Sequence, residues 1–124
     1  MLTEDLGRQR ADHIAVTGDL ANIGLPREYE TGLQWLRSLG NPDSVTVIPG
    51  NHDIYAPLRG DPGVGRWQPF MSANVTSEVM PEAPVPTAAQ RPDGCEFPFV
   101  RQYGAIALVG VNSAVETPLG YATG

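Results

Sequence analysis

Two short loops of the 124-residue sequence carry side chains suited to metal or phosphate chemistry. Gly18-Asp19 follows the apolar run 13–17, and Gly50-Asn51-His52-Asp53 follows the β-branched run 44–48. A carboxylate, an amide oxygen and an imidazole that converge make a metal or phosphate site plausible. Each motif alone is weak, because the same residue types also form ordinary turns and helix caps. The pair carries information only if the fold brings the two loops together.

The segments around the two loops predict that they meet. Residues 13–17 and 44–48 are typical of short buried strands. Between them a helix is predicted from Pro26 to Leu39, ended by Gly40, with one apolar stripe made of Tyr29, Leu33, Leu36 and Leu39. The strands of such a β-α-β unit are parallel, and their carboxyl ends share the sheet edge where α/β proteins bind ligands. We therefore expect Asp19 and residues 51–53 on one rim.

The rest of the chain divides into two further segments. Residues 54–95 contain seven of the twelve prolines and are predicted to be a loop-rich insertion, with 80–92 mobile. Within this insertion one helical turn is expected to be anchored by Trp67, Phe70 and Met71. Residues 96–115 predict a β-hairpin whose second arm is apolar enough for a central strand. Together with the β-α-β unit 1–53, these segments indicate one incomplete domain over 1–124.

Composition excludes several classes of protein. The net charge of −6 argues against strong nucleic-acid binding, and 41% hydrophobic residues favour a globular chain. The single cysteine, Cys95, forms no intrachain disulfide, so we expect a reduced, cytoplasmic location. Neither a signal peptide nor a membrane-spanning run is present in the sequence. His13, which opens the first strand, is interpreted as structural.

The two loops, in the contexts VTGDLANIG (16–24) and VIPGNHDIY (47–55), resemble the calcineurin-like metallophosphoesterases. The hairpin residues 97–101 and 107–113 are similar to the same family. The resemblance implies an α/β fold of mixed β-sheets flanked by helices. It also implies a centre of two metal ions (Mn, Fe or Zn) and hydrolysis of small-molecule phosphomonoesters or phosphodiesters. Cyclic nucleotides are one candidate substrate class.

The resemblance also assigns roles to individual residues. Asp19 is expected to bridge the two cations, and Asn51 to bind one of them through its side-chain oxygen. His52 is expected beside the phosphoryl group, where it stabilises developing charge or protonates the leaving oxygen. Asp53 is expected to accept a hydrogen bond from the other ring nitrogen of His52, which favours the imidazolium.

The sequence departs from the family pattern in its ligand count. It contains only two histidines and lacks the family's Asp-x-His, its later lone His and its closing Gly-His-x-His. Two transition-metal ions need roughly eight to ten donors, and Asp19 and Asn51 supply two. We therefore expect a fragment truncated at both ends, nearly inactive alone, with unpaired sheet edges and with the flanking segments of its own domain as missing partners.

Two other functional classes were weighed. A degenerate relative that keeps the fold as a non-catalytic binding module is the alternative, although retention of Asp19, Asn51, His52 and Asp53 counts against it. A Rossmann-type nucleotide domain is excluded, because no glycine-rich phosphate loop follows the first strand.

Overall fold

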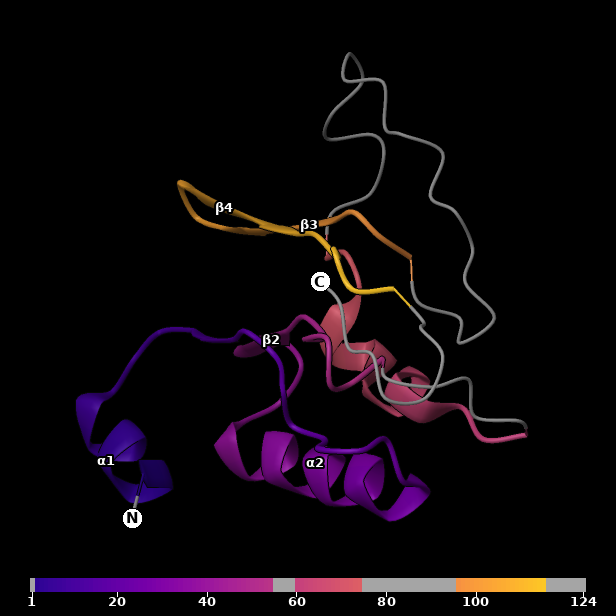
Figure 1. The fold of residues 1–124 in the computed structure, drawn as a ribbon. Helices are drawn as coiled ribbons and strands as arrows, with labels where there is room; N and C mark the ends of the chain where they lie inside the picture. Colours follow the sequence, from indigo (N-terminus) through magenta and orange to yellow (C-terminus); the bar gives the residue numbers. More distant parts are fainter. Residues whose placement is uncertain (1, 55–59, 75–95, 116–124) are drawn as a thin grey trace.

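The computed structural model describes residues 2–54, 60–74 and 96–115, which form an α/β arrangement. Its elements, labelled in Figure 1 apart from β1 and η1, are the helices α1 (Leu2–Gln9), α2 (Pro26–Leu39) and the 3₁₀ helix η1 (Gly63–Met71), and the strands β1 (Ile14–Val16), β2 (Val45–Val47), β3 (Phe99–Tyr103) and β4 (Ile106–Gly110). In Figure 1, β2 lies between α2 on one side and the β3–β4 hairpin on the other. The predicted mobile stretch 80–92 lies outside the described residues.

The strands β1 and β2 form a parallel pair, as predicted from the β-α-β pattern. Ile14 pairs with Val45 and Val16 with Val47. Backbone hydrogen bonds at both ends extend the pairing, from Ile14 N–H to the Ser44 carbonyl (2.9 Å) and from Ile48 N–H to the Val16 carbonyl (3.0 Å). Both chains therefore leave the sheet at the same edge, directly before Gly18 and Pro49.

Helix α2 has the boundaries that its sequence signals predict. It starts at Pro26, where a missing N–H costs no hydrogen bond, and the Gly40 N–H closes it on the Leu36 carbonyl at 3.3 Å. Tyr29 and Leu36 on the predicted stripe are fully buried. Leu33 and Leu39 are half-buried against the same core. Both end signals are local in sequence, which is why they could be read without the fold.

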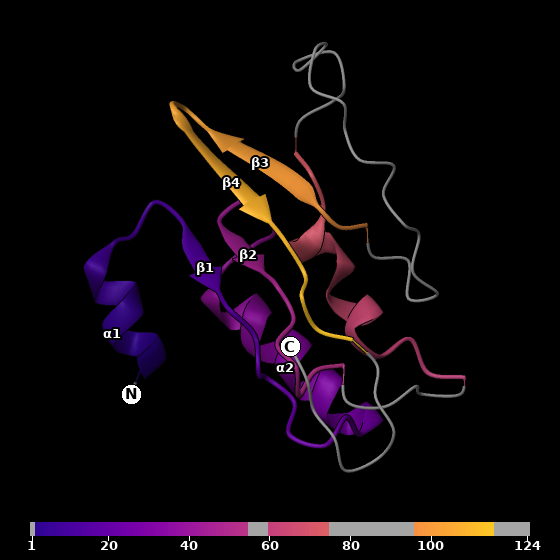
Figure 2. The same ribbon diagram turned by 45° about the horizontal axis from the view of Figure 1, so that its top comes forward.

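Helix η1 packs against α2 and β2 and closes the core (Figure 2). Trp67, Phe70 and Met71 are buried, which confirms the predicted anchored turn. The Trp67 indole N–H donates to the Tyr29 carbonyl at 2.9 Å, and the two rings lie 5.7 Å apart. Each such buried side chain contributes about 2–3 kcal/mol of apolar burial. No helix in the described part of the chain is long and apolar enough to cross a membrane.

The strands β3 and β4 form the predicted antiparallel hairpin, with Val100 opposite Val109. The prediction of β4 as a central strand is wrong within the described ranges. There β4 pairs with β3 alone, and Ile106 and Val109 are 64% and 60% exposed. Apolar composition misled here because it records what a strand is able to bury, while exposure depends on which neighbours cover it.

Arg101 of β3 fastens the hairpin to the rest of the fold. Its guanidinium is buried and donates to the backbone carbonyls of Pro42, Val45, Pro69 and Ser72. It also donates to the Thr46 hydroxyl at 3.2 Å. All of these acceptors are neutral, so the cation is held by dipoles and not by a carboxylate.

His13 lies beside this arginine, at the opposite end of β1 from Asp19. Its Nε2 is 2.8 Å from the Thr46 hydroxyl, and its ring packs on Tyr103 at 4.2 Å. Burial and the positive charge of Arg101 lower the pKa of His13, which favours the neutral ring. These contacts agree with the structural interpretation of His13.

Candidate functional site

The loops that follow β1 and β2 are in backbone contact. A Cβ atom at Gly18 would collide with the backbone of Pro49 and Gly50, and one at Gly50 would lie 2.7 Å from the Asp19 nitrogen. Gly18 also has φ of 96°, a conformation that residues with side chains rarely adopt. Only glycines allow the two loops to approach this closely. The predicted meeting of the loops on one rim is therefore confirmed.

Asp53 ties the two loops together from beneath. It is 1% exposed, and its Oδ2 accepts the N–H groups of Asp19 (2.7 Å) and Gly50 (2.9 Å). Its Oδ1 accepts the Ala21 N–H at 2.7 Å. Burial raises the pKa of the Asp53 carboxyl, and the three N–H donors oppose that rise. Because every partner is a donor, the ionised carboxylate is the form that fits this position.

Asp19 completes a reciprocal exchange between the loops. Its own N–H goes to Asp53, and its Oδ1 accepts the His52 N–H at 3.2 Å. Its φ of 58° is left-handed, a conformation that Asp tolerates better than most residues. The side chain is exposed, and the described residues make no other hydrogen bond to its carboxylate. The rim therefore presents a negative charge that is only lightly engaged.

The His52 ring is held by a backbone carbonyl, which corrects the predicted pairing with Asp53. Its Nδ1 lies 2.8 Å from the Asn22 oxygen. Because a carbonyl oxygen only accepts, Nδ1 carries the proton in this contact. Asp53 does not serve the ring because both of its oxygens bind the loop backbone.

Glu28 is a site residue that the sequence interpretation missed. Its Oε1 accepts the Asn22 N–H (3.3 Å), and its Oε2 accepts the N–H groups of Ile23 (3.2 Å) and Leu25 (2.9 Å). Partial desolvation raises the pKa of this carboxyl, but the backbone N–H groups outweigh it and hold the pKa below its usual value. A glutamate three residues after the helix N-cap is a capping signal in the sequence. No signal in the sequence marks the Asn22 carbonyl, because every residue has a backbone carbonyl.

The oxygen atoms of Asp19 and Asn51 fit a metal ion in part. Carboxylate and amide oxygens bind divalent cations, and both side chains extend from the shared rim. The described residues form no hydrogen bond with the Asn51 side chain, which is half-buried. Within residues 2–54, 60–74 and 96–115, no three His, Cys, Asp or Glu side chains are grouped to hold a metal ion. The site therefore supplies part of a coordination shell.

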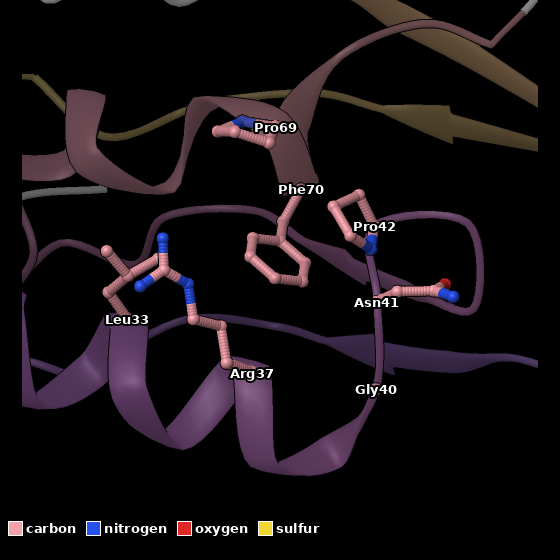
Figure 3. A pocket seen from close by; sticks show the side chains of 7 residues that line it. All are labelled: Leu33, Arg37, Gly40, Asn41, Pro42, Pro69 and Phe70. Atoms are coloured by element: carbon pink, nitrogen blue, oxygen red, sulfur yellow. The ribbon is translucent and has the colours of Figure 1, made fainter.

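A separate pocket of about 420 Å³ lies at the C-terminal end of α2, away from the rim (Figure 3). Figure 3 shows Phe70 at its centre, between Pro42 and the Leu33 and Arg37 side chains. Arg37 is its one titratable lining residue. Without a carboxylate or an imidazole, this pocket does not compete with the rim as a centre of metal chemistry.

Comparison with known proteins agrees with the geometry of the rim. A model of the family described as calcineurin-like phosphoesterase matches residues 1–106. The glycerophosphodiester phosphodiesterase GpdQ of Enterobacter lignolyticus (strain SCF1) is 46% identical over 46 residues. That match covers 37% of this chain and 16% of the length of GpdQ, so the chain spans a small part of this relative. No solved structure matches the chain.

Proposed function

The chain belongs to the calcineurin-like phosphoesterase family, and from that premise we propose that it forms part of a metal-dependent hydrolase of phosphodiesters or phosphomonoesters. Family membership carries metal dependence and small phosphoester substrates with it. The observation that supports a working site is the exchange of hydrogen bonds between the two loops. Asp19 and Asp53 hold each other's loop, so Asp19, Asn51 and His52 share one rim.

Asp19 and Asn51 are the residues that we assign to the metal centre. These residues would hold ions of manganese, iron or zinc, Asp19 through its carboxylate, which could serve two ions, and Asn51 through its amide oxygen. When bound, such ions polarise the phosphoryl group and make water nucleophilic near neutral pH. Because the sequence contains only two histidines, the proposal includes further ligands from outside these 124 residues. Residues 1–124 then form one incomplete domain.

His52 is the residue that we assign to the phosphoryl group. Its Nδ1 proton is engaged by the Asn22 carbonyl, so Nε2 is the atom that acts on the substrate. In the imidazolium form, Nε2–H stabilises charge on a phosphoryl oxygen or protonates the leaving oxygen. General acid catalysis of this kind contributes about 10²–10⁴-fold. Asp53 acts on the loop backbone and not on the substrate.

A phosphodiester with a glycerol group is the first substrate to test, because GpdQ is named a glycerophosphodiester phosphodiesterase. Cyclic nucleotides are the second. The net charge of −6 and the single cysteine support small-molecule substrates over nucleic acid and a cytoplasmic location.

The test measures metal content and hydrolysis of an aryl phosphodiester, on the 124-residue chain and on the longest polypeptide that carries it. Asp19→Asn keeps a side chain that tolerates the left-handed backbone, and we expect it to lose metal and activity in the longer polypeptide. His52→Ala is expected to keep the metal and to lose about 10²-fold in rate. Asp12→Asn, a charge change at an exposed position, is the matched control.

Two outcomes would count against this proposal. Equal loss of metal in the Asp19 and His52 variants would refute their separate roles. A longer polypeptide that binds phosphodiesters but hydrolyses none would favour the non-catalytic binding module. For the 124-residue chain alone we expect weak metal binding and negligible turnover.

A further inference from the structure

One peptide group lies between the side chains of His52 and Glu28. It joins Asn22 to Ile23: its carbonyl is the oxygen 2.8 Å from His52 Nδ1, and its N–H donates to Glu28 Oε2 at 3.2 Å. The only cis peptide in the described part of the chain is Phe97–Pro98, so this one is trans. In a planar trans peptide the N–H and C=O bonds point in opposite directions. A carboxylate that fixes the N–H on one side therefore aims the carbonyl on the other.

Glu28 is well placed to fix this peptide, because it extends from the first turn of α2. It also accepts the N–H groups of Asn22 and of Leu25, the residue before the helix. Asp53 accepts those of Asp19 and Ala21 in the same loop. Two carboxylates therefore hold different parts of the loop. Asp53 holds the part that contains Asp19, and Glu28 holds the part that contacts His52.

We propose that Glu28 is a positioning residue for His52, acting through the Asn22–Ile23 peptide. A carboxylate bonded to the N–H polarises the peptide and makes its carbonyl a stronger acceptor for Nδ1–H. The link between a carboxylate and the imidazole that was expected of Asp53 is supplied by Glu28 across one intervening peptide group. The value of this link to catalysis rests on the role proposed for His52, but the link itself is testable without substrate.

A purely structural role for Glu28 makes a different prediction. If Glu28 only caps α2 through Leu25, its removal weakens the helix and leaves the His52 ring as it was. If it positions the ring, its removal changes which ring nitrogen carries the proton. The tautomer of His52 therefore distinguishes the two roles.

The experiment is long-range ¹H–¹⁵N NMR of the imidazole nitrogens in the full chain, without metal or substrate, at a pH where the rings are neutral. Wild-type His52 is expected as the Nδ1–H tautomer. Glu28→Ala is expected to lower the ratio of Nδ1–H to Nε2–H by about fivefold, the effect of one ordinary hydrogen bond. Glu28→Gln, which keeps one acceptor oxygen, is expected to lie between. Glu30→Gln, an exposed position on the same helix, serves as the control and leaves the ratio unchanged.

His13 is an internal reference, since its ring contacts Thr46 and Tyr103 at the other end of β1 and its tautomer is expected to stay constant. Glu28→Asp separates charge from reach, because it keeps the charge but withdraws the oxygens by one methylene. We expect it to resemble Glu28→Ala. If Glu28→Ala does not fold, Glu28→Gln and Glu28→Asp decide the question.

An unchanged His52 tautomer in folded Glu28 variants would overturn the inference, as would a wild-type ring with its proton on Nε2. Because the readout needs no turnover, such a result leaves the phosphoesterase proposal intact. A tautomer shift combined with inactivity of the longer, metal-loaded polypeptide would instead sustain the link and remove the proposed function.

Discussion

The two ends of the β1–β2 pair are held by opposite charges. At the carboxyl end, Asp53, Asp19 and Glu28 accept backbone N–H groups. At the other end, Arg101 donates to backbone carbonyls from β2, η1 and their loops. In both places a charged side chain binds several backbone groups at once. The partners differ because the chain turns its N–H groups inward at one end and its carbonyls inward at the other.

The difference explains why only one end suits chemistry. Arg101 is 3% exposed and donates to neutral backbone and hydroxyl oxygens, so that end is structural. At the carboxyl end, Asp53 takes the buried structural role, while Asp19 is exposed and its carboxylate accepts a single N–H from the residues that the structure describes. The division of work between two aspartates is what keeps a charged ligand available on the rim.

The largest expected effect comes from removing the Arg101 side chain at the amino end of the β1–β2 pair. Arg101→Ala removes the donor to the buried Val45 carbonyl and to three partly buried carbonyls, and we expect it to lower the free energy of unfolding by about 4 kcal/mol. Urea denaturation of the chain measures the change. Arg37→Ala, which removes an exposed arginine of α2, is the control and is expected to change stability by less than about 0.5 kcal/mol. A similar loss of stability in both variants would show that Arg101 does not specifically stabilise this end of the β1–β2 pair.

Replacing Asp53, the buried carboxylate at the carboxyl end of the β1–β2 pair, is expected to lower the stability slightly less. Asp53→Asn places an NH₂ group against backbone N–H donors, and the free energy of unfolding is expected to fall by about 3 kcal/mol. The backbone amide signals of Asp19 and Ala21 in NMR are expected to shift, because they lose a charged acceptor. If stability fell while both signals stayed in place, the assignment of Asp53 as the fastener of the two loops would be wrong.

High pH tests how much Tyr29, which contacts Asp53 at the carboxyl end of the β1–β2 pair, contributes to stability. The Tyr29 hydroxyl donates to the Asp53 carbonyl at 2.9 Å, and burial, followed by the charge of Asp53, raises the pKa of Tyr29 to about 12. A raised pKa means that the folded state resists ionisation, so the stabilisation is complete below pH 10 and is lost as pH rises toward 12. Unfolding measured between these pH values is expected to become easier by about 2 kcal/mol. Tyr29→Phe should remove this dependence, and its persistence there would exclude Tyr29 as the cause.

The smallest effect is expected from acid at Glu28. Its pKa is lowered in the folded state, so its contribution to stability is complete above its ordinary pKa of 4.5 and is lost as pH falls below that value. The effect is small because the carboxyl is partly solvated. Thermal unfolding of the wild type and of Glu28→Gln is expected to converge in this acidic range. Glu30→Gln, compared with the wild type in the same way, should show no such convergence.

Much of the fold could be predicted because its signals are local. Pro26 and Gly40 mark the ends of α2, and the strand pairing follows from the β-α-β order. The meeting of Asp19 with residues 51–53 then follows from parallel strands alone. The sequence did not reveal the exposure of β4, because that depends on neighbours beyond the hairpin.

The hydrogen bonds within the site could not be predicted in the same way. Asp53 was assigned to the His52 ring, yet its partners are backbone N–H groups, which every residue except proline possesses. The same holds for the Asn22 carbonyl that took its place. Residue types indicate which side chains meet at a site, whereas contacts to the backbone depend on loop conformation. Glu28 is the exception, because its spacing from the start of α2 is a capping signal that the sequence contains.

The left-handed backbone of Asp19 limits what could ever replace it. At φ of 58°, glycine, asparagine and aspartate fit with little strain, whereas β-branched and bulky residues do not. Histidine also occurs in this region but brings no negative charge, and glutamate would begin with a conformational penalty before any ligand bound. Of the three residues that fit easily, aspartate alone brings a negative charge. Attempts to redesign the metal preference of this rim would therefore do better to vary Asn51 than Asp19.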